Sequence, residues 1–289
     1  MQSSGSDTIA IAKSSKFVLI EATTSEVFAT IKMQGRLQGF VSGFYFFAVV
    51  TEKGVIVLDC NGRCKDFIPS SFGVLDLDFH PTLPIVAIYF KDGGLLLRDF
   101  NESRMLLSVN NEPVECPQLR FSDDGRLFTE ILGNSVVIAF NRFCQPLSII
   151  WDQDDAQYMS TFYSSVYSEH IEFNDGIISV WNHPGGTCLR KLDQKLDEYE
   201  IHPNEHLIAG IPVDGKIHVW STKTLKVQRI IDFPEARPSI QFGRRDVLYV
   251  AGGQPMQLYL YNVRHGATEP PKIIQCGDYA GFCIGQSSI

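Results

Sequence analysis

The sequence lacks the features that mark a membrane-spanning or secreted chain. None of the apolar runs among the 289 residues approaches the roughly 18 consecutive apolar residues of a transmembrane helix. Residues 1–7 hold no basic stretch ahead of an apolar one, so they do not resemble a secretory signal. We therefore expect no membrane insertion, and we expect residues 1–7 to form a flexible N-terminus.

Paired cysteines are also missing. The seven cysteines are Cys60, Cys64, Cys116, Cys144, Cys188, Cys276 and Cys283. Their number is odd and no Cys-x-x-Cys pair occurs, which is not the pattern of a disulfide framework. Neither Cys60 with Cys64 nor His183 with Cys188 has the paired spacing of a tetrahedral metal site. We predict reduced, mostly buried thiols in a protein of the cytoplasm or nucleus, without a metal.

Positive charge is scarce. The chain carries 25 Lys and Arg against 33 Asp and Glu, which gives a net charge of −8. A protein that wraps nucleic acid needs Lys and Arg to release counterions from the phosphates. Direct nucleic-acid binding is therefore not expected, although a role in an RNA- or DNA-associated complex with direct contact stays as an alternative.

Catalytic signatures are absent as well. The sequence holds no Gly-x-Ser-x-Gly, no glycine-rich phosphate loop and no His-Glu-x-x-His. Turn chemistry explains His80 and His202, because each is followed by a proline. We predict that the chain is not an enzyme and that it uses no cofactor.

Short β-strands dominate what is present. Apolar or alternating runs of four to six residues, rich in β-branched and aromatic side chains, are bounded by Gly, Asn, Asp or Pro. Asp-Gly or Lys-Gly pairs stand between two such runs at residues 53–54, 92–93, 175–176 and 214–215. Glycine at these places supplies the positive φ angle of a tight hairpin turn. The chain therefore reads as a series of β-hairpins.

The hairpins recur with a fixed period. A strand that ends in a bulky apolar residue followed by a polar one repeats at Glu21, Asp59, Asp99, Asn141, Asn182, Ser221 and Asn262, which are 38 to 42 residues apart. Arg98 is the exception, since it stands where the other units have an apolar side chain. A period of about 40 residues with four strands per unit predicts a ring of small sheets.

These repeats resemble those of WD-repeat β-propellers. The best matches run from Asp78-Phe-His-Pro to Asp99 and from Ile201-His-Pro to Trp220-Ser, and the similarity extends over almost the whole chain. The resemblance implies an all-β fold, a single β-propeller of four-stranded antiparallel blades. It also implies a binding scaffold as an expectation for function.

The count of strands predicts seven blades. Within residues 8–289, we expect blades at 8–31 together with 278–285, 38–68, 72–109, 114–150, 157–192, 196–232 and 236–275. The first blade would take its innermost strand from the C-terminal segment, because pairing the two ends removes an open sheet edge. A six-bladed ring with flanking extensions is the alternative.

One candidate binding site follows the fourth predicted blade. Trp151 is followed by Asp152, Asp154 and Asp155, which we expect in an inter-blade loop on the face that related propellers use for partners. A Trp anchor with an acidic rim would suit a peptide that carries Lys or Arg. The alternative is that Trp151 packs between blades and the acids are only solvated.

A second candidate lies in the segment 233–238. Phe233 and Arg237 are residue types favoured in interface hot spots, and both could equally be spacers between blades. We expect a non-catalytic scaffold for protein–protein interaction, a subunit of a larger complex that docks peptide segments of other proteins. The remaining alternative, a small-molecule propeller enzyme, would need at least three converging His or carboxylate ligands in the channel.

Overall fold

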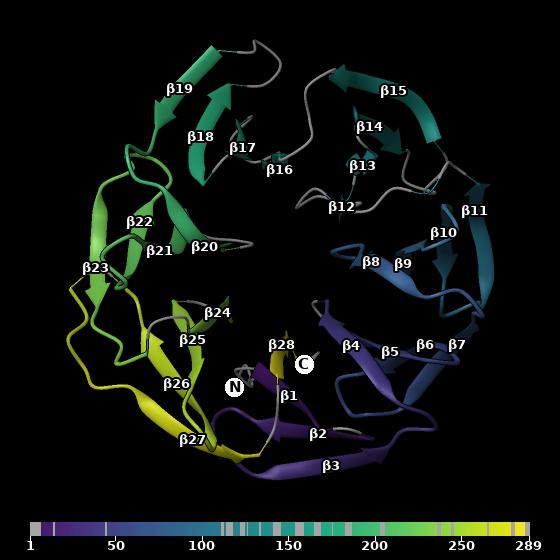
Figure 1. Cartoon of the computed structure of the whole chain (residues 1–289), viewed down its shortest axis with the longest axis horizontal. Coiled ribbons are helices and arrows are strands. Elements are labelled where there is room, and N and C mark those ends of the chain that lie inside the picture. The colour runs from purple at the N-terminus through teal and green to yellow at the C-terminus, as the bar shows by residue number, and fades with distance from the viewer. Residues whose placement is uncertain are drawn as a thin grey trace, which may run out of the picture.

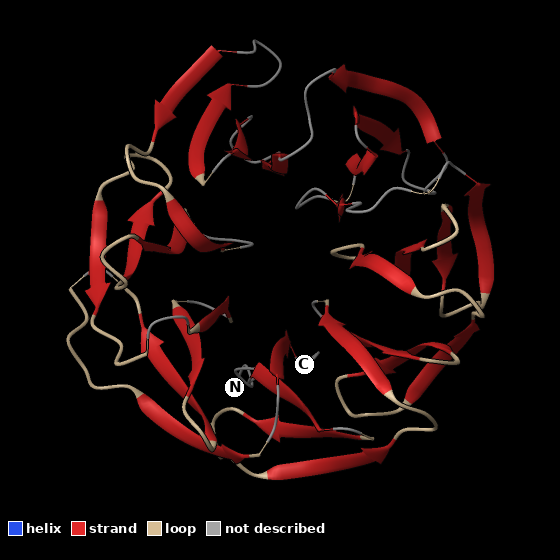
Figure 2. Cartoon of the chain, in the orientation of Figure 1, coloured by secondary structure: helices blue, strands red, loops and turns tan. Residues whose placement is uncertain are grey.

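The computed structural model describes most of the chain. The described residues are 7–13, 15–43, 45–110, 113, 118–121, 125, 127–132, 134–140, 146–153, 159–164, 169–174, 176–182, 187–202, 206–235, 238–243, 246–264, 266–278 and 281–286. All regular elements in these ranges are β-strands (Figure 2). None of the described ranges holds a helix that could cross a membrane.

The strands form seven sheets of four (Figure 1). The first sheet is β28 (Gly281–Gln286), β1 (Asp7–Lys13), β2 (Lys16–Glu21) and β3 (Val27–Lys32). The second is β4 (Leu37–Ser42), β5 (Phe46–Thr51), β6 (Gly54–Asp59) and β7 (Cys64–Pro69). The third is β8 (Val74–Phe79), β9 (Ile85–Phe90), β10 (Gly94–Asp99) and β11 (Arg104–Asn110).

The other four sheets repeat this order. The fourth is β12 (Gln118–Phe121), β13 (Leu127–Leu132), β14 (Asn134–Phe140) and β15 (Pro146–Gln153). The fifth is β16 (Met159–Ser164), β17 (Glu169–Asn174), β18 (Ile177–Asn182) and β19 (Thr187–Lys191). The sixth is β20 (Leu196–Ile201), β21 (Leu207–Pro212), β22 (Ile217–Ser221) and β23 (Val227–Ile231), and the seventh is β24 (Ser239–Phe242), β25 (Val247–Gly252), β26 (Met256–Asn262) and β27 (Lys272–Gly277).

The sheets stand as blades around a central axis, with the first strand of each sheet innermost (Figure 1). Strands from the two ends of the chain close the ring, because β28 pairs antiparallel with β1 from Asp7 opposite Gln286 to Ala12 opposite Gly281. The prediction of seven four-stranded blades, with the C-terminal segment as the innermost strand of the first, is confirmed. The six-bladed alternative is wrong, because each end of the chain supplies strands to one shared sheet.

The first strand begins one residue earlier than the sequence predicted. Asp7, assigned to the flexible segment 1–7, is the first residue of β1 and is only 6% exposed. The Tyr249 hydroxyl of β25 donates a hydrogen bond of 2.8 Å to Asp7 Oδ2. Burial, together with this neighbouring charge, raises the pKa of Tyr249. Asp7 therefore ties the first blade to the seventh, while residues 1–6 lie outside the described residues.

Apolar contacts between blades make the core. One cluster joins the seventh and first blades through Tyr249, Ile11 and Ile284, and similar clusters lie at the other boundaries whose side chains are described. Apolar residues of the strands, many of them β-branched or aromatic, supply these side chains. Burying one such side chain contributes about 1.5–3 kcal/mol, so the blades hold each other in register.

Arg98, the exception in the repeat pattern, makes an ion pair between blades. Its Nε donates to Asp66 Oδ2 of β7 at 2.6 Å, and the Ser103 hydroxyl donates to Asp66 Oδ1 at 3.0 Å. The Arg98 guanidinium and this hydroxyl lower the pKa of Asp66. Arg98 thus joins the third blade to the outer strand of the second, which explains the charged residue at an otherwise apolar position.

Candidate functional site

Carboxylates cover part of the open edge of the innermost strands. An edge strand leaves one row of backbone amides without a neighbouring strand. Asp76 Oδ2 of β8 accepts the amide of Leu119 in β12 at 2.8 Å, and Asp78 Oδ2 accepts the amide of Phe121 at 2.7 Å. These charge-assisted hydrogen bonds join the third blade to the fourth across the wall of the channel.

The same two carboxylates bind amides of their own strand. Asp76 Oδ1 accepts the amide of Leu77, and Asp78 Oδ1 accepts the amide of Phe79, both at 2.9 Å. Each carboxylate therefore holds two edge amides, one on either side of the boundary between blades.

Two further boundaries use this arrangement. Glu198 Oε1 of β20 accepts the amide of Ile240 in β24 at 3.3 Å, and Gln241 Oε1 accepts the amide of Ile284 in β28 at 3.1 Å. In all these bridges the donor follows the acceptor by 42 or 43 residues, which is close to one repeat of about 40. The acceptors thus come from two positions of the repeat. Asp76 and Glu198 hold the first position, and Asp78 and Gln241 hold the second, two residues later.

Two buried acids of the innermost strands have raised pKa values. Burial raises the pKa of Asp78 to about 6 and that of Glu200, two residues after Glu198 in β20, to about 7. The positive charge of Arg120 opposes both shifts, and its Nη1 lies 3.6 Å from Asp76 Oδ2. The channel wall is therefore acidic, with two groups that titrate near neutral pH.

In the part of the chain that the structure describes, no carboxylate or side-chain amide bridges the boundary between the first and second blades. Gly281 of β28 occupies the position that Asp76 holds in β8. Two residues later, the Cys283 thiol hydrogen-bonds the Ser42 side chain of the next blade, so the register at this boundary is the usual one. A Cβ added to Gly281 would lie 3.5 Å from the ring of Phe40 in β4, within ordinary contact. The missing side chain leaves space at this boundary.

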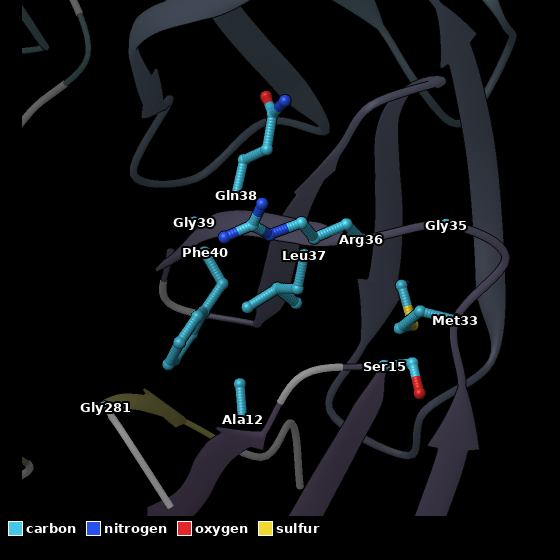
Figure 3. Close-up of a pocket in the computed structure, with 10 residues that line it drawn as sticks. All are labelled: Ala12, Ser15, Met33, Gly35, Arg36, Leu37, Gln38, Gly39, Phe40 and Gly281. Carbon is cyan, nitrogen blue, oxygen red and sulfur yellow. The ribbon is translucent and has the colours of Figure 1, made fainter.

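A pocket of about 800 Å³ opens there (Figure 3). Its lining residues are Ala12, Ser15, Met33, Gly35, Arg36, Leu37, Gln38, Gly39, Phe40 and Gly281. The floor is apolar and buried at Ala12 and Met33, and the rim is exposed and polar at Arg36 and Gln38. Segment 33–36, which links β3 to β4, and Ser15, just before β2, border it. An apolar floor with a few polar groups at the rim is the usual form of a binding pocket.

In Figure 3, Arg36, just before β4, runs along this strand, and the ring of Phe40 points from the strand toward Ala12 and Gly281. Gly35 has a φ of 114°, and neither Gly35 nor Gly39 has an atom within 4 Å of an added Cβ. A register shift between Leu37 and Gly39 marks a bulge at the start of β4. Small residues and the bulge together keep the strand edge accessible from the pocket.

Among the described residues, no group of three or more His, Cys, Asp or Glu side chains converges to hold a metal ion. Five of the seven cysteines are described, and none of the five forms a disulfide. Three of them are buried, and Cys64 and Cys188 are exposed. Cys116 and Cys144 lie outside the described residues.

Phe233 does not lie on the surface. It is only 5% exposed and packs edge-to-face on Tyr259, with the two ring centroids 5.0 Å apart. It belongs to the cluster between the sixth and seventh blades, together with Ile231 and Ile240. The predicted partner-binding role required an exposed ring, so that role is wrong for Phe233, which is the spacer that the sequence allowed as its alternative.

A substitution tests this packing role. We expect Phe233→Ala to lower the free energy of unfolding by about 3 kcal/mol, because it leaves a cavity between two blades. Chemical denaturation of the purified variant measures this loss. Exposed Ile230, on β23 and 53% exposed, offers the control, since Ile230→Ala removes a side chain of similar type with little burial. Equal stability of the two variants would contradict the packing role.

The tryptophan site falls on a strand. Trp151 and Asp152 belong to β15, opposite Val137 and Val136 of β14, and not to an inter-blade loop as predicted. The outer strand runs on to Gln153 because two register shifts in the β14–β15 pairing accommodate the extra residues. Asp154 and Asp155 lie outside the described residues, as does Arg237, so their predicted roles stay predictions.

Solved structures of two other proteins share this arrangement of sheets. The β-propeller domain of Cps50 (Swd1) from Myceliophteria thermophila aligns with a TM-score of 0.65 and 13% identity, over 86% of this chain and 93% of that one. The computationally designed Ika8 protein aligns with a TM-score of 0.61 and 14% identity, over 94% and 88%. The chain has a β-propeller fold. No protein-family model and no curated protein sequence matches it.

The pocket of this propeller was not among the sites expected from sequence. The signal that could have found it is the absence of an acid at one position of the repeat. Gly39 and Gly281 stand at this position, where the best-matching repeats have Asp76 and Glu198. Alignment of the innermost strands by their pairing partners makes this visible. Sequence spacing alone did not, because Gly281 lies in the strand that the chain adds from its other end.

Proposed function

We propose that this propeller is a non-catalytic scaffold for protein–protein interaction that docks a peptide segment of a partner in the pocket between its first and second blades. The observation that carries the proposal is the pocket itself, about 800 Å³ at a blade boundary where an inter-blade bridge is absent. A rigid ring changes shape little on binding, so short segments can dock without a large ordering cost.

The surroundings of the pocket support this use. Phe40 and Leu37 are half-buried and give an apolar wall, and Arg36 and Gln38 are exposed and can orient a peptide. Buried apolar contacts with a polar rim are the typical composition of an interface. Segment 33–36 belongs to the inter-blade links, the face on which partner binding was expected.

The repeat pattern supports a place among WD-repeat propellers with divergent repeats. Units of about 40 residues end in an apolar-polar pair, and Trp220-Ser221 and Trp181-Asn182 are the nearest forms of the family's Trp-Asp ending. A subunit of a multiprotein assembly in the cytoplasm or nucleus is the role that we propose on this basis. Fold alone does not carry it, because one fold hosts many functions.

Affinity capture of the tagged chain from its native cells tests the proposal. We expect a stoichiometric set of proteins that survives high salt and that is lost when the pocket rim is changed by Arg36→Glu with Gln38→Lys. Lys226→Glu, an exposed charge reversal on the sixth blade, is the matched control and should keep the set.

The outcomes separate the site from the function. If the pocket variant and the control retain the same proteins, the scaffold stands and the pocket is not its docking site. If no stoichiometric protein is captured with the unchanged chain, the scaffold proposal itself is wrong.

A further inference from the structure

The backbone amide of Phe40 points to the open edge of β4 and not toward β5. Gly43 donates its amide to the Phe46 carbonyl at 2.8 Å, and bonded pairs recur at every second residue along an antiparallel ladder. The amides of Val41 and Gly39 therefore point toward β5, and the amide of Phe40 points to the open edge of β4.

The amide of Phe282 points the same way from the first blade. Ile284 donates its amide to Gln241 Oε1, across the blade boundary and away from β1. Since alternate amides of a strand share a direction, the amide of Phe282, two residues earlier, also faces the open edge of β28. Phe282 directly follows Gly281, which lines the pocket.

Asp76 shows what an equivalent pair of amides binds. One oxygen of its carboxylate accepts the amide of the next residue in its own strand, and the other accepts an amide from the innermost strand of the next blade. At the boundary between the first and second blades, Gly281 takes the place of Asp76. The amides of Phe282 and Phe40 there correspond to the two amides that Asp76 binds. Among the described residues, no carboxylate or side-chain amide accepts a hydrogen bond from the backbone amide of Phe282 or of Phe40.

The pocket that Phe40 lines also holds a positive charge. Arg36 is exposed at the rim, and within the described ranges no ion pair joins it to an acid. Its guanidinium extends over Leu37 toward Gly39 (Figure 3). Backbone amides and a guanidinium are both donors that favour a carboxylate, and an apolar floor lowers the competition from water.

We propose that the pocket binds an acidic peptide segment of another protein, with one carboxylate seated on the amides of Phe40 and Phe282 beside Arg36. The partner's Asp or Glu then supplies in trans the bridge that Asp76 and Glu198 supply in cis at other boundaries. Its neighbouring apolar side chains contact Phe40, Leu37 and Met33. This inference rests on the proposed scaffold function and names the chemistry of its partner.

Amide chemical shifts of the full chain, labelled with ¹⁵N-phenylalanine, test the inference. The probe is the peptide acetyl-Leu-Asp-Leu-amide, and its Asn analogue is the neutral comparison. We expect saturable shifts of the Phe40 and Phe282 amides with the Asp peptide and binding about tenfold weaker with the Asn peptide, because the charge-assisted bonds are lost. Single Phe→Leu variants assign the two signals.

A variant that rebuilds the missing bridge sharpens the test. Gly281→Asp places a carboxylate in cis, and its Cβ makes only an ordinary contact with Phe40. We expect it to shift the same two amides, to abolish binding of the Asp peptide and to raise the melting temperature. Gly281→Ala adds the Cβ without the acceptor, so it should still bind the peptide.

Three results would overturn the carboxylate site: the two amides do not move with the Asp peptide, the Asn peptide binds equally well, or Gly281→Asp and Gly281→Ala bind the peptide alike. The capture experiment is independent of all three. Partners lost with the Arg36→Glu and Gln38→Lys variant, together with unmoved amides, would keep the scaffold and remove only this inference. Absence of partners would remove the scaffold.

Discussion

A chain cut after Asp278 is expected to lose cooperative folding. The cut removes β28, whose six residues each pair with a residue of β1. It also removes Cys283 and Ile284, both 5% exposed, from the clusters that join the first blade to its two neighbours. Thermal denaturation followed by circular dichroism should show a broad transition or none, where the full chain shows a single one.

The size of this loss follows from the contacts of one strand. Each backbone hydrogen bond contributes about 1 kcal/mol and each buried apolar side chain about 1.5–3 kcal/mol. Their sum is about 5 kcal/mol or more, which is comparable to the whole stability of many domains. The cut also exposes an edge of β1, and an open edge is a site for aggregation.

Rescue in trans provides the control for this truncation. A synthetic peptide of residues 279–289, added to the truncated chain, should restore the cooperative transition, because the strand needs no covalent link to pair with β1. The same peptide with Ile284→Asp should fail, since that residue is buried between blades. Closure by β28 would be contradicted if the truncated chain melted like the full one.

The strand pattern and the closure of the ring could be predicted from the sequence because they depend on local and periodic features. Turns such as 92–93 and 214–215 need glycine at a positive φ, and Gly93 and Gly215 have φ values of 89° and 74°. The seven-blade count needed only the repeat length and the cost of an open edge. Both arguments hold whichever residues fill the core.

The functional surface could not be predicted in the same way. Phe233 was a candidate anchor because of its residue type, but burial in the core favours the same type, and only the packing against Tyr259 separates the two. The inter-blade bridges of Asp76 and Asp78 did leave a signal, two acids alternating on an innermost strand. Their meaning depends on where the next blade's amides point, which spacing alone does not give.

The bridge made by Asp78 has the second-largest expected effect. We expect Asp78→Ala to lower the free energy of unfolding by about 3 kcal/mol at pH 7, measured by chemical denaturation. The substitution removes the acceptor for the amides of Phe79 and Phe121, and hydrogen bonds to a charged group contribute about 1.5–3 kcal/mol each. Asp78→Asn should cost less, because its amide oxygen can still accept one of the two, as Gln241 does in the seventh blade.

The pH dependence gives this bridge a second signature. Because burial raises the pKa of Asp78 to about 6 in the folded protein, above its ordinary value of 3.8, the folded state binds a proton that the unfolded state has lost. That contribution to stability is complete below pH 4 and is lost as the pH rises through about 6. The unchanged protein should therefore lose stability between pH 5 and pH 7.5, by about 1 kcal/mol or more.

Asp78→Asn should reduce that loss, because the amide does not ionise, and Glu200→Gln should reduce the part that extends to about pH 7. Asp92→Asn, at an exposed hairpin turn, is the control that should leave the pH profile unchanged. If Asp78→Asn kept the full pH dependence, the carboxylate would not be desolvated at the blade boundary. Asp78 would then join the two blades through its hydrogen bonds without a burial effect on its pKa, and it would be as hydrated as a surface carboxylate.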